Sequence, residues 1–305
     1  PGAAPPTYVD PKLVEGKIRL EPAVLAVSCE RIKEELLRAL NAPDRWRGQI
    51  TLVLRPFAAQ DTRITVASVL HPDGWRYRLD LPDRVEAEQL FHVVVTVLLR
   101  EMANQHSGDQ SVELPAWLVE GIAPHLRATA QTPLLLESET AWAQPRLARS
   151  YRMPDPLRVV RERLRSGPAL SFAELSQPND IPPARWGFYQ SCAHLFVSEL
   201  LSLPNGRDAM QEMLRLLPQH LNWQFAFLRA YQSHFHAALD VEKWWSVTVV
   251  SFLSRDQHAK WPMAAGLQPL DDIVVSSGQI RAATNALPQR SEVRLQALIE
   301  QVDYP

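Results

Sequence analysis

The spacing of apolar residues predicts one helix, then three strands, then a helical remainder. Four apolar side chains recur at helical spacing after Ser28, a residue type that favours helix N-caps: Ile32, Leu36, Leu37 and Leu40. We therefore expect a helix over residues 28–40. Three extended segments follow at residues 49–57, 63–70 and 74–81. The sequence "HPDG" between the last two favours a tight turn.

The segment "GWRYRLDL", residues 74–81, alternates strictly between two kinds of side chain. Its apolar positions are Trp75, Tyr77, Leu79 and Leu81, and its charged positions are Arg76, Arg78 and Asp80. In a strand the two sets point to opposite faces, so one face should be buried and the other charged. A strand of this kind often lies at a sheet edge or beside a cleft. We therefore expect Trp75, Arg76, Tyr77 and Arg78 to form the edge of a cleft.

Helical patterns occupy most of the remaining chain. A long helix is expected over residues 85–105 and a second over 115–127, where Pro124 should end or kink it. Further helices are expected at residues 155–164, 172–175, 186–203, 206–217, 223–231, 241–253 and, near the end, 291–302. These elements predict an α+β fold with a small mixed sheet, a long central helix and a helical C-terminal lobe.

The first residues, "PGAAPPTYVDP", are rich in Pro and Ala and lack periodicity, so residues 1–22 are expected to be flexible. One domain is expected over residues 23–254, with the sheet and its helices in 23–127 and the helical lobe in 128–254. Residues 255–305 are expected to form a C-terminal extension with a final helix. The lead-in is typical of the segment left after a signal peptide or of an artificial boundary, and we expect a periplasmic or extracellular location.

Composition and charge exclude some classes of partner. The chain is 46% hydrophobic and has 32 basic against 34 acidic side chains, which argues against a nucleic-acid partner recognised by charge. No apolar run approaches the roughly 20 residues that a membrane helix needs, so we expect no membrane span. Cys29 and Cys192 are the only cysteines, and a disulfide or two buried free thiols would fit the sequence equally well.

Two segments carry a resemblance to a known family. "REMAN", residues 100–104, precedes "LPAWLVEGIA", residues 114–123, on the next expected helix. This arrangement resembles the gluzincin metallopeptidases, in particular the bacterial peptidase MA-like proteins. In that family a long helix carries H-E-x-x-H, whose two His bind zinc and whose Glu polarises water, and a following L-P-x-W-L-x-E-G-x-A helix supplies a third ligand. The resemblance implies a zincin fold over residues 23–253, with Glu101 as the general base and Glu120 as the third ligand.

The chain departs from this pattern at both histidines, where Arg100 and Asn104 stand instead. A guanidinium has no free lone pair, and an amide oxygen is a poor zinc ligand. We therefore expect no metal, no cofactor and a catalytically inactive homologue that keeps its cleft as a binding or scaffolding surface for an extended peptide or protein. Because a buried unpaired carboxylate is destabilising, we also expect Arg100 to form an ion pair with Glu120.

Two other functions are left open by the sequence. One is a hydrolase that uses Glu101 and Glu120 for acid/base chemistry, with an unusual metal or none. The other is a purely structural domain of an envelope assembly. The chain has no G-x-S-x-G, P-loop, G-x-G-x-x-G or C-x-x-C motif.

The remaining histidines and cysteines give no further catalytic signal. Four histidines are interpreted as surface or hydrogen-bonded residues: His106, His125, His234 and His236. His92 lies two helical turns before Arg100, which is too far to replace a ligand at that position. Cys192 and His194 are two residues apart on an expected helix and point in different directions, so a cysteine hydrolase is not expected.

Overall fold

The structure, a computed structural model, describes residues 16–108, 110–136, 157–259, 275–280 and 289–294. The chain divides into two compact units, Pro1–Val249 and Val250–Pro305. The first unit contains strands β1 (Lys17–Arg19), β2 (Gln49–Arg55), β3 (Thr65–His71), β4 (Gly74–Pro82) and β5 (Arg84–Glu86). Its helices are α1 (Pro22–Leu40), α2 (Ala87–Asn104), α3 (Ala116–Thr129), α4 (Arg158–Leu164), α5 (Phe172–Ser176), α6 (Trp186–Ser202), α7 (Gly206–Leu216) and α8 (Trp223–Ala230). Helix α9 (Ala238–Ala259) crosses the boundary between the units.

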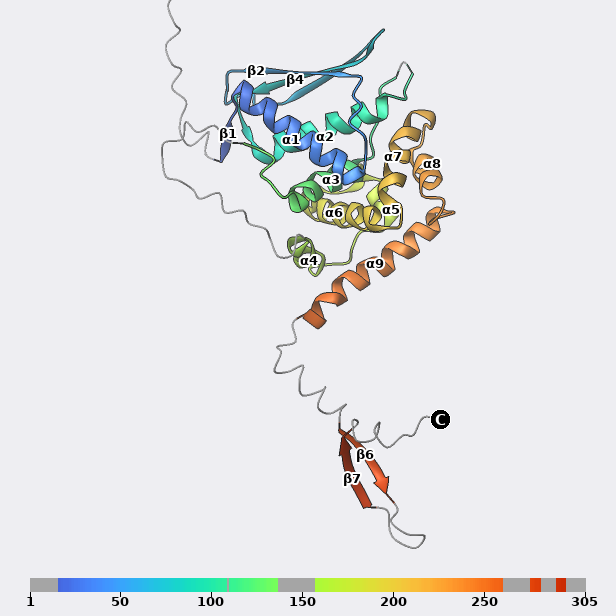
Figure 1. Cartoon of the computed structure of the whole chain (residues 1–305). Helices are drawn as coiled ribbons and strands as arrows, with labels where there is room; N and C mark the ends of the chain where they lie inside the picture. The colour runs from blue at the N-terminus through green and yellow to red at the C-terminus, as the bar shows by residue number, and fades with distance from the viewer. Residues whose placement is uncertain (1–15, 109, 137–156, 260–274, 281–288, 295–305) are drawn as a thin grey trace, which may run out of the picture. The chain divides into compact units, whose positions relative to one another are not determined.

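These elements form successive layers in the first unit. The sheet lies against α1 and α2, and α3 and α6 lie on the other side of these two helices (Figure 1). The predicted α+β class with a small mixed sheet is confirmed. No helix in the described parts of the chain has the length and apolar character needed to cross a membrane.

Strand β4 lies in the centre of a three-stranded mixed sheet with the order β2-β4-β3. It runs parallel to β2 and antiparallel to β3, so that Leu79 lies between Leu52 and Val66. Of the two positions expected for such a strand, the sheet edge is therefore wrong, whereas the position beside a cleft stays a prediction. The alternation did identify the two faces correctly, because Trp75 and Tyr77 are buried while Arg76 and Arg78 are exposed. Alternation shows which side of a strand is buried, but it does not show whether other strands flank it.

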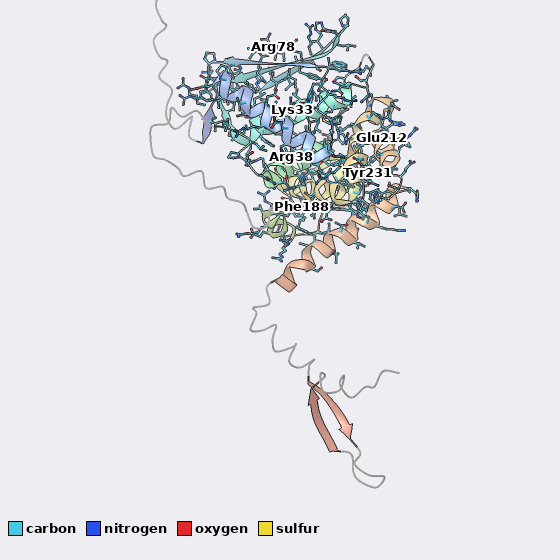
Figure 2. The ribbon with its side chains drawn as sticks, in the orientation of Figure 1. Lys33, Arg38, Arg78, Phe188, Glu212 and Tyr231 are labelled. Atoms are coloured by element: carbon cyan, nitrogen blue, oxygen red, sulfur yellow. The ribbon has the colours of Figure 1, made fainter. Side chains whose placement is uncertain are left out.

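The charged face of the sheet points away from the helices. Arg78 lies on this outer face (Figure 2), where its guanidinium pairs with the Asp80 carboxylate at 2.9 Å. Arg76 likewise pairs with Asp73 at 2.9 Å. Both arginines therefore have local partners within the same strand or turn, and such exposed pairs contribute little to stability.

Helix α1 begins six residues before the predicted start. Pro22 occupies its first turn, where a proline is favoured because its fixed φ suits a helix and its missing N–H is not needed. Ser28 is therefore in the interior of the helix, and its hydroxyl donates to the carbonyl oxygen of Val24 at 2.9 Å. The stretch expected to be flexible also includes β1, which pairs with β5 in a small antiparallel sheet.

Helix α3 continues through Pro124 to Thr129. Its close packing on α6 depends on Gly121, where an added Cβ would lie 2.3 Å from the carbonyl oxygen of Ala193. The buried Trp117 packs edge-on against Phe196 of α6, with ring centroids 5.1 Å apart, and against Phe227 of α8. The core of the helical lobe is therefore built around α3.

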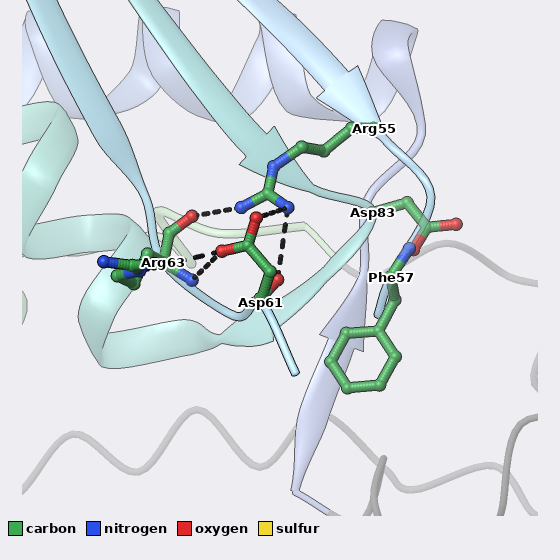
Figure 3. Close-up of polar contacts among 5 residues, drawn as sticks. All are labelled: Arg55, Phe57, Asp61, Arg63 and Asp83. Carbon is green, nitrogen blue, oxygen red and sulfur yellow. Dashed lines mark hydrogen bonds and ion pairs between the residues drawn. The ribbon is translucent and has the colours of Figure 1, made fainter. Parts of the chain in front are cut away.

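The connection between β2 and β3 is held by Arg55 (Figure 3). Its guanidinium donates to the Asp61 carboxylate at 2.7 Å and also reaches the carbonyl oxygen of Arg63. The backbone N–H of Phe57 donates to the Asp83 carboxylate at 2.8 Å, and the N–H of Asp83 donates to the carbonyl oxygen of Arg55 at 2.7 Å. These bonds fix the end of β2 to the turn that follows β4.

The second unit contains an antiparallel pair of strands, β6 (Val275–Ile280) and β7 (Gln289–Arg294). Residues 291–294 therefore belong to a strand, not to the start of the helix predicted over 291–302, and residues 295–302 lie outside the described part of the chain. The predicted boundary after residue 254 falls within α9.

Candidate functional site

Three polar contacts set the register between α2 and the chain that follows it. The Arg127 guanidinium pairs with Glu88 at 2.9 Å, the His92 imidazole contacts Glu120 at 3.0 Å, and the Val112 N–H donates to the Asn104 side-chain oxygen at 2.8 Å. The early residues of α2 thus face late residues of α3, and the end of α2 faces the loop before α3. The two helices run antiparallel, and Glu120 lies opposite the first half of α2.

Glu120 is held by an imidazole and an amide. One carboxylate oxygen lies 3.0 Å from His92 Nε2, and the other accepts a 2.8 Å hydrogen bond from Gln190 Nε2 on α6. The side chain is only 12% exposed, and burial alone would raise its pKa. The hydrogen bonds from His92 and Gln190, with the charge of His92, outweigh burial and hold the pKa of Glu120 below its ordinary value.

The predicted ion pair between Arg100 and Glu120 does not form. His92 takes that place, and Arg100 lies eight residues later on α2, about 12 Å along the helix axis. Arg100 Nε is buried and has no hydrogen-bond partner within the described chain. The prediction failed because it assumed that the end of α2 faces Glu120, whereas the antiparallel register brings His92, the sixth residue of α2, to that position.

Glu101 links α2 to the start of β2. Its carboxylate accepts a 2.6 Å hydrogen bond from the backbone N–H of Gly48 and a longer one, at 3.3 Å, from Gln105. The residue is 1% exposed, and a Cβ on Gly48 would lie 2.2 Å from one of its carboxylate oxygens. Glu101 is therefore packed against backbone and shielded from solvent.

Asn104 organises the loop between α2 and α3. Its side-chain N–H groups donate to the Tyr77 hydroxyl at 2.7 Å and to the Ser111 hydroxyl at 3.2 Å, while its oxygen accepts from the Val112 N–H. Burial raises the pKa of Tyr77 above its ordinary range, although the bond from Asn104 acts in the opposite direction. The amide thus has a structural role that an imidazole could not fill in the same way.

The residues predicted to share one site therefore separate into two groups. Glu101 and Asn104 contact β2, β4 and the loop, whereas Glu120 contacts His92 and Gln190. The sequence interpretation missed His92 and Gln190. A signal for His92 was present, because Thr96 follows it at a spacing of four residues, the spacing of two ligands on one helix face. Gln190 lies 70 positions after Glu120 and has no such local signal.

One side of α2 remains accessible at this site. His92, Val93, Thr96 and Arg100 are all half-buried, and their spacing places them on one side of the helix. On this side of the helix the Thr96 hydroxyl donates a hydrogen bond to the His92 carbonyl oxygen at 2.7 Å.

Within the described residues, no group of three or more His, Cys, Asp or Glu side chains is placed to hold a metal ion.

The two cysteines are free thiols, and burial raises the pKa of Cys192 to about 11, which disfavours the nucleophilic thiolate. His125 and His194 lie near each other between α3 and α6, with ring centroids 6.2 Å apart. His234 bonds to the carbonyl oxygen of Pro204 at 2.9 Å.

Comparison of the chain with protein-family models, with curated proteins and with solved structures gave no match.

Proposed function

We propose that this chain is a non-catalytic, metallopeptidase-like domain that acts by binding. The contact between His92 and Glu120 supports this proposal, because it identifies the part of α2 that lies opposite Glu120. The residues of that part, and not those of the end of the helix, would then occupy the positions of the H-E-x-x-H motif. The segment opposite Glu120 is "HVVVT", residues 92–96, and not "REMAN". In an H-E-x-x-H arrangement His92 would be the first ligand, Val93 would replace the general base and Thr96 would replace the second ligand.

This register leaves too few groups for zinc chemistry. Val93 has no lone pair to activate water, and the neutral Thr96 hydroxyl is a poor zinc ligand. The His92 imidazole and the Glu120 carboxylate remain, but they are hydrogen-bonded to each other. The second carboxylate oxygen of Glu120 accepts a hydrogen bond from Gln190. Loss of the base and of one ligand argues for a domain in which the helix pair is kept for its shape.

The alternative hydrolase, with Glu101 and Glu120 as an acid/base pair, has little support. Glu101 follows His92 by nine residues on α2, which is about 13 Å along the helix axis. Glu120 contacts His92, while Glu101 contacts the backbone of Gly48. Two carboxylates that act on one bond must lie much closer together than this.

An extended peptide is the partner that the sheet favours. Since β4 is central, the free edges belong to β2 and β3, and a peptide can extend a sheet only at such an edge. Strand β3 exposes two large aliphatic side chains, Val69 at 55% and Leu70 at 41%. We place the peptide beside β3, where its side chains would contact these residues.

The non-catalytic part of the proposal is tested by metal content and proteolysis. Protein purified without chelator should contain no stoichiometric zinc by elemental analysis, and it should leave denatured casein intact. One zinc per chain, together with casein cleavage that a chelator abolishes, would show that the chain is an active metallopeptidase.

The binding part is tested with a fluorescently labelled peptide of alternating Val and Thr. Anisotropy should rise on addition of the protein, and Val69→Lys should weaken binding about tenfold because a charge replaces an apolar contact. Thr51→Lys, at an exposed position on the opposite edge strand, is the matched control and should have little effect. Equal loss in both variants, or no binding at any reachable concentration, would contradict a β3 site.

A further inference from the structure

A mainly apolar cavity of about 520 Å³ lies between α1, the sheet and α2. Aliphatic side chains form most of its wall, including Val27 of α1, Ile50 and Leu52 of β2, Leu79 of β4 and Val94 and Leu98 of α2. This volume is within the range of pockets that hold a single small molecule. It lies apart from the contact between His92 and Glu120, since none of these wall residues takes part in that contact.

The cavity exists because α1 does not close over β2. The inner side chains of central strand β4 are fully buried, as Leu79 shows at 1% exposure. The inner side chains of β2, Ile50 and Leu52, are only half-buried. On the opposite wall, Val27 of α1 is 47% exposed. A ligand that entered here would remove apolar surface from water on both walls.

The charges at the cavity disfavour an anionic ligand. The Lys33 ammonium is the basic group on the wall, and it already pairs with Glu30 at 2.6 Å and with Asp44 at 3.5 Å. Two carboxylates therefore accompany one ammonium at this point. A carboxylate on the ligand would be repelled, whereas a hydroxyl or carbonyl oxygen would not.

We propose that this cavity binds one small, uncharged, mainly apolar molecule. Aliphatic alcohols, esters and amides belong to this class. The proposal goes beyond the peptide-binding function and does not depend on it, because the cavity is walled by α1, the inner face of the sheet and α2, while the peptide is placed at the β3 edge.

Displacement of the neutral fluorophore phenylnaphthylamine from the full chain tests the proposal. Octanol should displace the dye, and octanoate, which has the same chain length but a negative charge, should do so at least tenfold more weakly. Octanoate binding as tight as octanol would overturn the assignment of the ligand class.

A second pair of variants locates the site. Cys29→Phe adds an aromatic ring to the cavity wall at a half-buried position and should abolish octanol binding. Val247→Phe adds the same ring at a position that is 70% exposed on α9 and should leave binding unchanged. If Cys29→Phe does not fold, Ala26→Phe, at an exposed wall position, replaces it. Normal binding by a folded wall variant, or no displacement in the unmodified chain, would contradict the proposal.

Discussion

Glu101 and Glu120 are carboxylates in helix interiors, and the chain stabilises each in a different way. Glu101 accepts a hydrogen bond from the backbone N–H of Gly48. Glu120 is instead hydrogen-bonded to the side chains of His92 and Gln190, which belong to two other helices. In both cases the hydrogen bonds offset the loss of water that burial imposes. The identity of the partner therefore tells more about the role of each carboxylate than its position in a motif.

Gly48→Ala should destabilise the fold by about 1–3 kcal/mol, because the new methyl group would overlap the Glu101 carboxylate and force it away from its N–H donor. Urea denaturation measures the change. Gly167→Ala is the control, since a Cβ at Gly167 meets no atom within 4 Å, and it should change the free energy of unfolding by less than about 0.5 kcal/mol. Equal effects in the two variants would contradict the contact.

Thr96→His should create a zinc site. The new imidazole would lie one turn after His92 on the same face of α2, with Glu120 already beside His92. Stoichiometric zinc by elemental analysis is the expected result. The double variant Arg100→His, Asn104→His places two imidazoles at the register first suggested by the sequence, and it should bind none because Glu120 is too far away. Zinc bound by the double variant and not by Thr96→His would show that the end of α2, and not His92, lies opposite Glu120.

At the level of elements, periodicity predicts most of this fold. The strands at 49–55, 65–71 and 74–82 and the helices from α2 to α9 fall close to their expected positions, because each has an apolar face that the sequence displays locally. The position of β4 within the sheet and the partner of Glu120 were not predictable in this way. Both depend on which segments meet in space, and the 11 residues between α2 and α3 allow more than one register.

Helices α3 and α6 approach each other closely at Gly121. Gly121→Ala should destabilise the fold by ~3 kcal/mol or more, since the methyl group would lie 2.3 Å from a backbone carbonyl oxygen of α6. This loss should exceed that of Gly48→Ala, because a backbone atom in a helix cannot rotate away as a carboxylate can. Urea denaturation of both variants under the same conditions compares them. A smaller loss in Gly121→Ala would mean that the two helices can separate easily.

For the molecule as a whole, the buried His194 and the half-buried His125 set the response to acid. Burial lowers the pKa of His125 to about 4, with a contribution from the charge of Arg207, and lowers the pKa of His194 to about 3. In the unfolded chain both groups take up a proton near pH 6.5. Between about pH 6.5 and 4 the unfolded state therefore binds protons that the folded state does not, and stability falls as the pH is lowered.

Each histidine should contribute a slope of about 1.4 kcal/mol per pH unit over this window, and stability should be constant with respect to both groups above about pH 6.5. Urea denaturation at a series of pH values measures the slope. His194→Phe removes one titrating group and should reduce the slope by about half. A slope unaffected by His194→Phe would show that other groups control acid sensitivity.

The two free cysteines have a consequence for where such a fold can exist. Cys192 is completely buried, and burial raises the pKa of Cys29 to about 12, so both thiols remain protonated and slow to exchange. No disulfide therefore crosslinks the described part of the first unit, and its cohesion comes from packing, hydrogen bonds and ion pairs. Folding of this unit therefore does not depend on the formation of a covalent bond between its two cysteines.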